Sequence, residues 1–63
     1  MKITAKEVLD RLSNEGFVET RIKGDHHRFE DNQGHKVSVP YTRLKDTISP
    51  TTYRFIKRQA GWK

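Results

Sequence analysis

The stretch Val18–Pro40, VETRIKGDHHRFEDNQGHKVSVP, contains three short runs of strand-forming residues separated by two turn signals. Its first run alternates with a period of two, which predicts a strand with one buried face. The predicted inward residues are Val18, Thr20 and Ile22, and the predicted outward residues are Glu19, Arg21 and Lys23. Together the runs and turns predict an antiparallel meander of three strands with the second strand in the middle.

The two turn signals determine how these strands pair. Gly24-Asp25 suits a two-residue hairpin with glycine at the first central position of a type II′ turn, and Asn32-Gln33-Gly34 suits a three-residue loop. For the first hairpin the predicted pairs are Lys23 with His26, Ile22 with His27, Arg21 with Arg28, Thr20 with Phe29, and Glu19 with Glu30. For the second they are His27 with Val39, Arg28 with Ser38, Phe29 with Val37, and Glu30 with Lys36. Both hairpins assign the residues of the middle strand to the same two faces of the sheet, so one face is predicted to be apolar and the other basic.

Helices are predicted on both sides of the meander. Thr4 and Glu7 form a capping box for a helix over residues 5–15, and Ser49-Pro50 begins a second helix that ends before Gly61. The residues predicted to enter the core are Val8, Leu9 and Leu12 in the first helix, Tyr53, Ile56 and Ala60 in the second, and Leu44 and Ile48 between them. The expected fold class is α+β, in the order α-β-β-β-α, with both helices on the apolar face of the sheet.

Length and composition limit the class of protein. The 63 residues suffice for one small domain over residues 1–63, and the absence of cysteine excludes disulfides and thiolate metal sites. A net charge of +5 favours a polyanionic partner, since Lys and Arg release the counterions condensed on nucleic acid. No apolar run reaches the roughly 18 residues of a membrane span, and the charged N-terminus does not suit a signal peptide. A cytoplasmic protein without a membrane partner is therefore expected.

The adjacent histidines His26 and His27 are predicted to face opposite sides of the sheet, because strand residues alternate. His27 is predicted to face the helices, so the two histidines are not expected to bind one metal ion. The basic face is predicted to carry Arg21, Lys23, His26, Arg28, Lys36 and Ser38, and all of these except His26 are predicted to bind RNA phosphate. There, a neutral imidazole can take the proton of an attacking ribose 2′-hydroxyl while Lys23 and Arg28 stabilise the phosphoryl charge. A merely solvated basic surface explains the same residues.

Four motifs follow one another along nearly the whole chain: GF at Gly16-Phe17, KGDH at Lys23–His26, VP at Val39-Pro40, and PTTYRFIKRQAG at Pro50–Gly61. In this combination the sequence resembles the HicA toxins, small RNA-cleaving proteins of bacterial toxin-antitoxin pairs. The resemblance implies a double-stranded-RNA-binding-domain-like fold, cleavage of mRNA without a metal or other cofactor, His26 as the catalytic residue, and inhibition by a HicB antitoxin. Asp25 stands where the family usually has a small residue, and it adds a negative charge where phosphate would approach.

Two other functions remain open. A non-catalytic RNA-binding module would use the same cations to bind the RNA backbone, and its affinity would fall steeply with salt. A protein-interaction domain would need a partner to cover its open sheet face, and it would bind RNA weakly.

Overall fold

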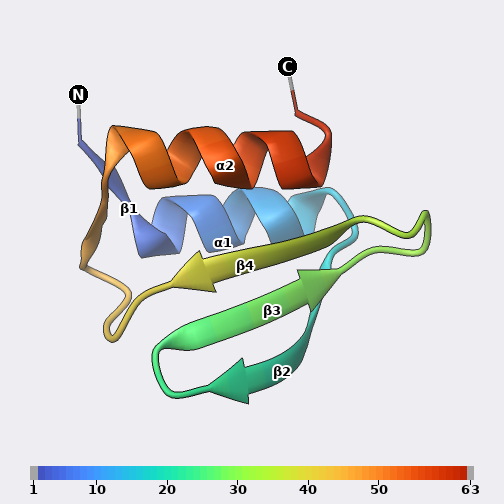
Figure 1. Cartoon of the computed structure of the whole chain (residues 1–63), viewed down its shortest axis with the longest axis horizontal. Coiled ribbons are helices and arrows are strands. Elements are labelled where there is room, and N and C mark those ends of the chain that lie inside the picture. Colours follow the sequence, from blue (N-terminus) through green and yellow to red (C-terminus); the bar gives the residue numbers. More distant parts are fainter. Residues whose placement is uncertain (1, 63) are drawn as a thin grey trace.

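The computed structural model of the protein describes residues 2–62. In chain order its elements are β1 (Ile3–Thr4), α1 (Ala5–Asn14), β2 (Val18–Lys23), β3 (His26–Glu30), β4 (Lys36–Pro40), β5 (Thr47–Ile48) and α2 (Pro50–Ala60). Strands β2, β3 and β4 form the predicted antiparallel sheet, and α1 and α2 lie together on one face of it (Figure 1). The predicted fold class is confirmed. No helix within residues 2–62 is long and apolar enough to cross a membrane.

Both helices begin at the predicted caps. Thr4 Oγ1 accepts a hydrogen bond from the Glu7 N–H at 3.3 Å, and Ser49 Oγ accepts one from the Thr52 N–H at 3.2 Å. Gly61 ends α2 in the left-handed conformation, with a φ of 76°. Helix α1 ends at Asn14, one residue before the predicted end. A difference of one residue is common at helix ends, because the last turn frays.

Both predicted hairpin loops are present. A type II′ turn has a positive φ at its first central residue and a negative φ at its second. Gly24 has a φ of 62°, whereas no non-glycine residue within residues 2–62, Asp25 included, has a positive φ. Gly34 provides the left-handed position of the second loop, with a φ of 90°. Strands β3 and β4 pair in the predicted register throughout.

The far half of β2 departs from the predicted register. The three pairs nearest the turn are as predicted, but a β-bulge at Thr20 places Glu19 opposite Phe29 and Val18 opposite Glu30. The predicted pairs of Thr20 with Phe29 and of Glu19 with Glu30 are therefore wrong. The extra residue turns Thr20 to the basic face, where its Oγ1 donates to Glu30 Oε2 at 2.9 Å. It also turns Glu19 to the opposite face.

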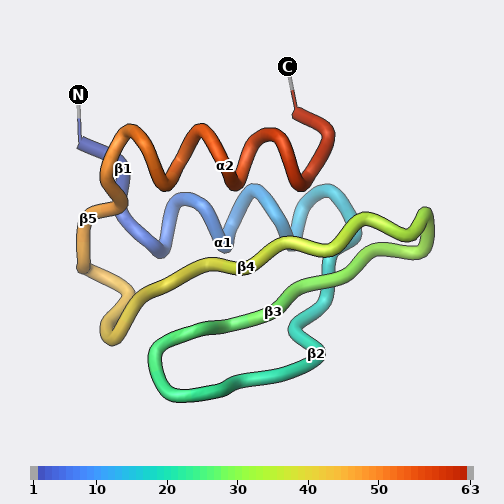
Figure 2. Tube along the Cα trace, viewed as in Figure 1, coloured from blue at the N-terminus to red at the C-terminus, as the bar shows by residue number. Residues whose placement is uncertain are grey.

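Strand β2 is exposed on both faces, so the prediction that one of its faces is buried is wrong. Val18 and Ile22 are 63% and 58% exposed, and Thr20 is exposed as well. Strand β2 is one edge of the sheet, whereas α2 packs against β4 at the other edge (Figure 2). The helices therefore cover β3 and β4 but not β2. The buried core consists of Ala5, Val8, Leu12, Phe17, Phe29, Val37, Val39, Ile48, Ile56 and Ala60.

The connection between β4 and α2 supplies one core side chain instead of the predicted two. Ile48 is buried and lies in β5, which pairs with β1 opposite Ile3; these two-residue strands are too short to give a periodic signal. Leu44 is 49% exposed, so its predicted burial is wrong. Its carbonyl oxygen accepts a hydrogen bond from the Lys6 N–H at 3.0 Å. The backbone of Leu44, and not its side chain, thus attaches this connection to α1.

Candidate functional site

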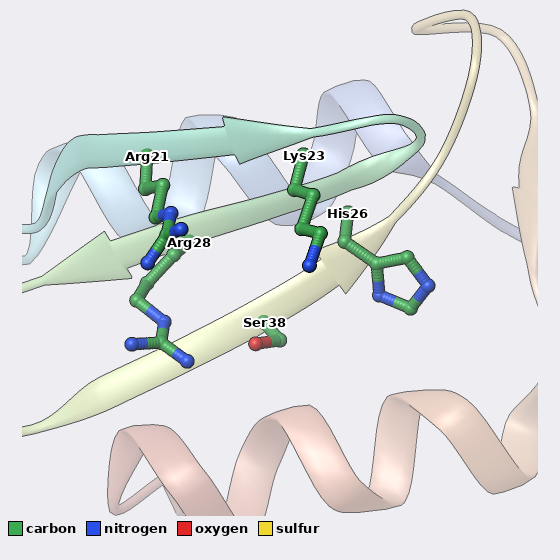
Figure 3. A pocket seen from close by; sticks show the side chains of 5 residues that line it. All are labelled: Arg21, Lys23, His26, Arg28 and Ser38. Carbon is green, nitrogen blue, oxygen red and sulfur yellow. The ribbon is translucent and has the colours of Figure 1, made fainter.

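Five of the six residues predicted for the basic face surround one hollow of about 300 Å³, namely Arg21, Lys23, His26, Arg28 and Ser38 (Figure 3). They come from all three strands of the sheet, and the two-residue period places them on the face away from the helices. The sixth, Lys36, lies on the same face opposite Glu30 and does not line the hollow.

The hollow has an excess of positive charge. Arg21 lies directly opposite Arg28, and Lys23 lies directly opposite His26. The two arginines carry like charges in directly opposed positions and therefore repel each other. The ion pairs formed among residues 2–62 do not include Arg21, Lys23 or Arg28. An anion in the hollow would therefore be attracted by three cations that no carboxylate neutralises.

His26 lies at the end of the hollow next to the turn, and its side chain is 67% exposed. Its Nε2 is 3.5 Å from Oδ1 of Asp25, whose side chain is 59% exposed. Water screens an ion pair at this exposure, so the attraction between the two groups is small. The imidazole is accessible to a ligand that enters the hollow, with Lys23 on the neighbouring strand.

A comparison with known protein families matches residues 5–62 to the family described as HicA toxin of bacterial toxin-antitoxin. The chain belongs to the HicA toxin family. The match includes every element from α1 to α2, and it confirms the resemblance found in the sequence. The role of this HicA-family chain is therefore that of the toxin in a toxin-antitoxin pair. No match is found among curated proteins.

Behind the hollow, the HicA-family chain holds His27 between Glu19 and Tyr41. His27 Nδ1 is 2.9 Å from Glu19 Oε2, and the imidazole stacks on the Tyr41 ring with centroids 3.8 Å apart. The His27 side chain is only 14% exposed. Burial, together with the charge of Glu19, raises the pKa of Tyr41. The predicted placement of the two histidines on opposite faces is confirmed.

The residues around His27 also anchor the turn that carries His26. The Tyr41 N–H donates to the carbonyl oxygen of Asp25 at 2.8 Å, which ties the end of β4 to the turn between β2 and β3. Sequence reasoning missed Glu19, because the residue reaches this face only through the bulge. It also missed Tyr41, although the position directly after β4 was an available signal.

The surroundings of the hollow include a helix and an acidic group. The Ser38 N–H donates to Gln59 Oε1 at 3.0 Å, which attaches α2 to the outer edge of β4. On the same face as the hollow, Glu30 is held by Thr20 and lies opposite Lys36. The basic face of this HicA-family chain thus has α2 along one edge.

In the part of the chain that the structure describes, no three His, Cys, Asp or Glu side chains gather so that they could hold a metal ion.

Proposed function

We propose that this HicA-family toxin is an endoribonuclease that cleaves mRNA without a metal ion and uses His26 as its general base. The observation that supports this best is the position of His26 in the same hollow as Lys23 and Arg28. A phosphate held by these cations brings the ribose of its own nucleotide close to the imidazole. Binding and proton transfer would then occur at one place.

In the proposed reaction, neutral His26 takes the proton of a ribose 2′-hydroxyl. The 2′-oxygen forms a bond to the adjacent phosphorus, and the bond from phosphorus to the 5′-oxygen breaks. One product ends in a 2′,3′-cyclic phosphate, and the other ends in a 5′-hydroxyl after the leaving oxygen takes a proton from water. The hydroxide that remains takes the proton from His26, which restores the neutral imidazole. Lys23 and Arg28 stabilise the negative charge on the phosphoryl oxygens, while Arg21 and Ser38 hold the phosphate in place.

Cleavage of single-stranded RNA by the purified protein in the presence of a chelator tests this function. We expect fragments with 2′,3′-cyclic phosphate and 5′-hydroxyl ends, because attack by the 2′-hydroxyl produces these ends. The ends can be identified by mass spectrometry. Fragments with 5′-phosphate ends would contradict the mechanism, since they arise when water attacks the phosphate instead.

Non-catalytic RNA binding is the second candidate function, and the exposure of His26 favours it. A general base is commonly oriented by a third group, whereas the His26 side chain is 67% exposed. In this case the cations of the hollow bind the RNA backbone and His26 is one more contact. The protein would then bind RNA but leave it intact at every protein concentration.

The proposed protein partner is a HicB-like antitoxin. In a toxin-antitoxin pair the antitoxin inhibits the toxin, and a protein that covered the hollow would do so by excluding RNA. The toxin, its antitoxin and mRNA would meet in the cytoplasm.

Replacement of Arg28 with glutamine is expected to weaken RNA binding and to reduce its salt dependence. Each phosphate neutralised in a single strand contributes about −0.7 to the slope of log K against log salt concentration, and the slope for Arg28→Gln should be shallower by about that amount. Fluorescence anisotropy with an RNA whose 2′-hydroxyls are methylated measures binding without cleavage. Lys36→Gln is the matched control, because Lys36 lies on the same face but outside the hollow. An equal change for Lys36→Gln would contradict confinement of the phosphate to the hollow.

A further inference from the structure

We propose that Phe55 of α2 is a stacking platform for a base of the RNA strand that the hollow binds. The inference rests on the proposed function, and it adds a residue that would orient the strand beside His26. Proteins that bind single-stranded nucleic acid commonly combine a cationic groove with aromatic side chains on which the bases stack.

One side of α2 is turned toward the outer edge of β4. Gln59 lies on this side, since it accepts the hydrogen bond from the Ser38 N–H. Phe55 lies four residues before Gln59, and helix residues four apart are neighbours on one side. Ser38 also lines the hollow, and α2 runs along β4 beside it (Figure 3). Phe55 therefore belongs to the surface that continues from the hollow across β4.

Phe55 is also level with His26 along the sheet. Helix α2 and strand β4 run in opposite directions (Figure 1). Starting from the contact between Ser38 and Gln59, four residues of helix span about 6 Å and two residues of strand span about 7 Å. Phe55 and Pro40 are therefore displaced by nearly the same distance in the same direction. Because Pro40 lies opposite His26, an RNA strand that leaves the hollow at His26 and crosses Pro40 reaches Phe55.

The ring of Phe55 is available for stacking. Phe55 is 54% exposed, and the guanidinium carbon of Arg58 lies 6.0 Å from the centroid of its ring. The other large hydrophobic side chains exposed within residues 2–62 are aliphatic, namely Val18, Ile22 and Leu44. An exposed aromatic ring with Arg58 close to it thus adjoins a cationic hollow, and this combination suits a single-stranded nucleic acid.

The charges around Phe55 favour RNA over an apolar protein surface as its ligand. Arg54 and Arg58 are both exposed on α2, one residue before and three residues after Phe55. An apolar partner that covered Phe55 would bury these cations without neutralising them, which is unfavourable. An RNA strand would instead bring phosphates close to the same cations while one of its bases stacks on the ring.

Binding measurements in the His26→Ala background test the proposal, because the RNA then stays intact. We expect Phe55→Ala and Phe55→Leu to weaken the binding of a short single-stranded RNA by about fivefold or more, and Phe55→Trp to retain it. Leucine keeps an apolar side chain but has no π-face, so the Phe55→Leu loss isolates stacking. Ile22→Ala is the matched control: Ile22 is 58% exposed but lies opposite His27, on the other face of the sheet, and binding should be unchanged.

Several outcomes would overturn the proposal. Equal binding by the Phe55→Leu protein and its parent would exclude stacking. Loss of antitoxin binding in the Phe55 variants with unchanged RNA binding would assign the ring to a protein interface instead. If the His26→Ala parent binds no RNA, the proposed function fails together with this inference. If the parent binds RNA and all Phe55 variants bind it equally well, only the inference about Phe55 fails.

Discussion

His26→Ala is expected to slow RNA cleavage by about 10²- to 10⁴-fold, the range that a positioned general base contributes, and to leave the protein folded. The imidazole is the group that takes the 2′-hydroxyl proton in the proposed reaction, and methyl cannot replace it. The side chain is 67% exposed and belongs to no part of the buried core, so its removal should change the free energy of unfolding little. Single-turnover cleavage rates and thermal melting of the wild type and variant measure the two effects separately.

His27→Ala is the matched control, since it removes the same side chain from the neighbouring position on the opposite face. His27 is hydrogen-bonded to Glu19 and stacked on Tyr41, so this variant should lose stability. The molecules that remain folded should still cleave RNA, because the hollow is unchanged. A fully active His26→Ala protein beside a folded but inactive His27→Ala protein would contradict the assignment of the general base.

Leu12→Ala is expected to lower the free energy of unfolding by about 2–5 kcal/mol. Leu12 is fully buried, at 0% exposure, and it is among the largest side chains of the core. A domain of this length has a total stability on the order of 3–9 kcal/mol, so the cavity would remove a large part of it. Urea denaturation followed by circular dichroism measures the change.

Leu44→Ala is the matched control for Leu12→Ala, because it makes the same substitution at an exposed position. The hydrophobic pattern assigns Leu12 and Leu44 alike to the core, whereas Leu44 is 49% exposed in the structure. Its replacement should change the free energy of unfolding by no more than about 0.5 kcal/mol. A loss as large as that of Leu12→Ala would contradict the exposed position of Leu44.

The arrangement of the candidate site could be predicted as far as it depends on local rules. The two-residue loop at Gly24 sets the register next to the turn, and the register places His26 and Lys23 on one face and His27 on the other. The bulge at Thr20 could not be predicted, because the alternation of residues in β2 continues through it without a break. The contact of Glu19 with His27, which depends on the bulge, was therefore missed as well.

The sequence by itself determined the helix caps at Thr4 and Ser49, the two hairpin loops and the face on which each histidine lies. Caps, turns and strand periods depend on residues that are close together along the chain, so the sequence contains the whole signal. Only the tertiary structure decided that β2 stays exposed and that α2 runs along the outer edge of β4, where Gln59 accepts a hydrogen bond from the Ser38 N–H. These features depend on how the helices sit on the sheet, and this position is set by packing between segments that are distant in the sequence.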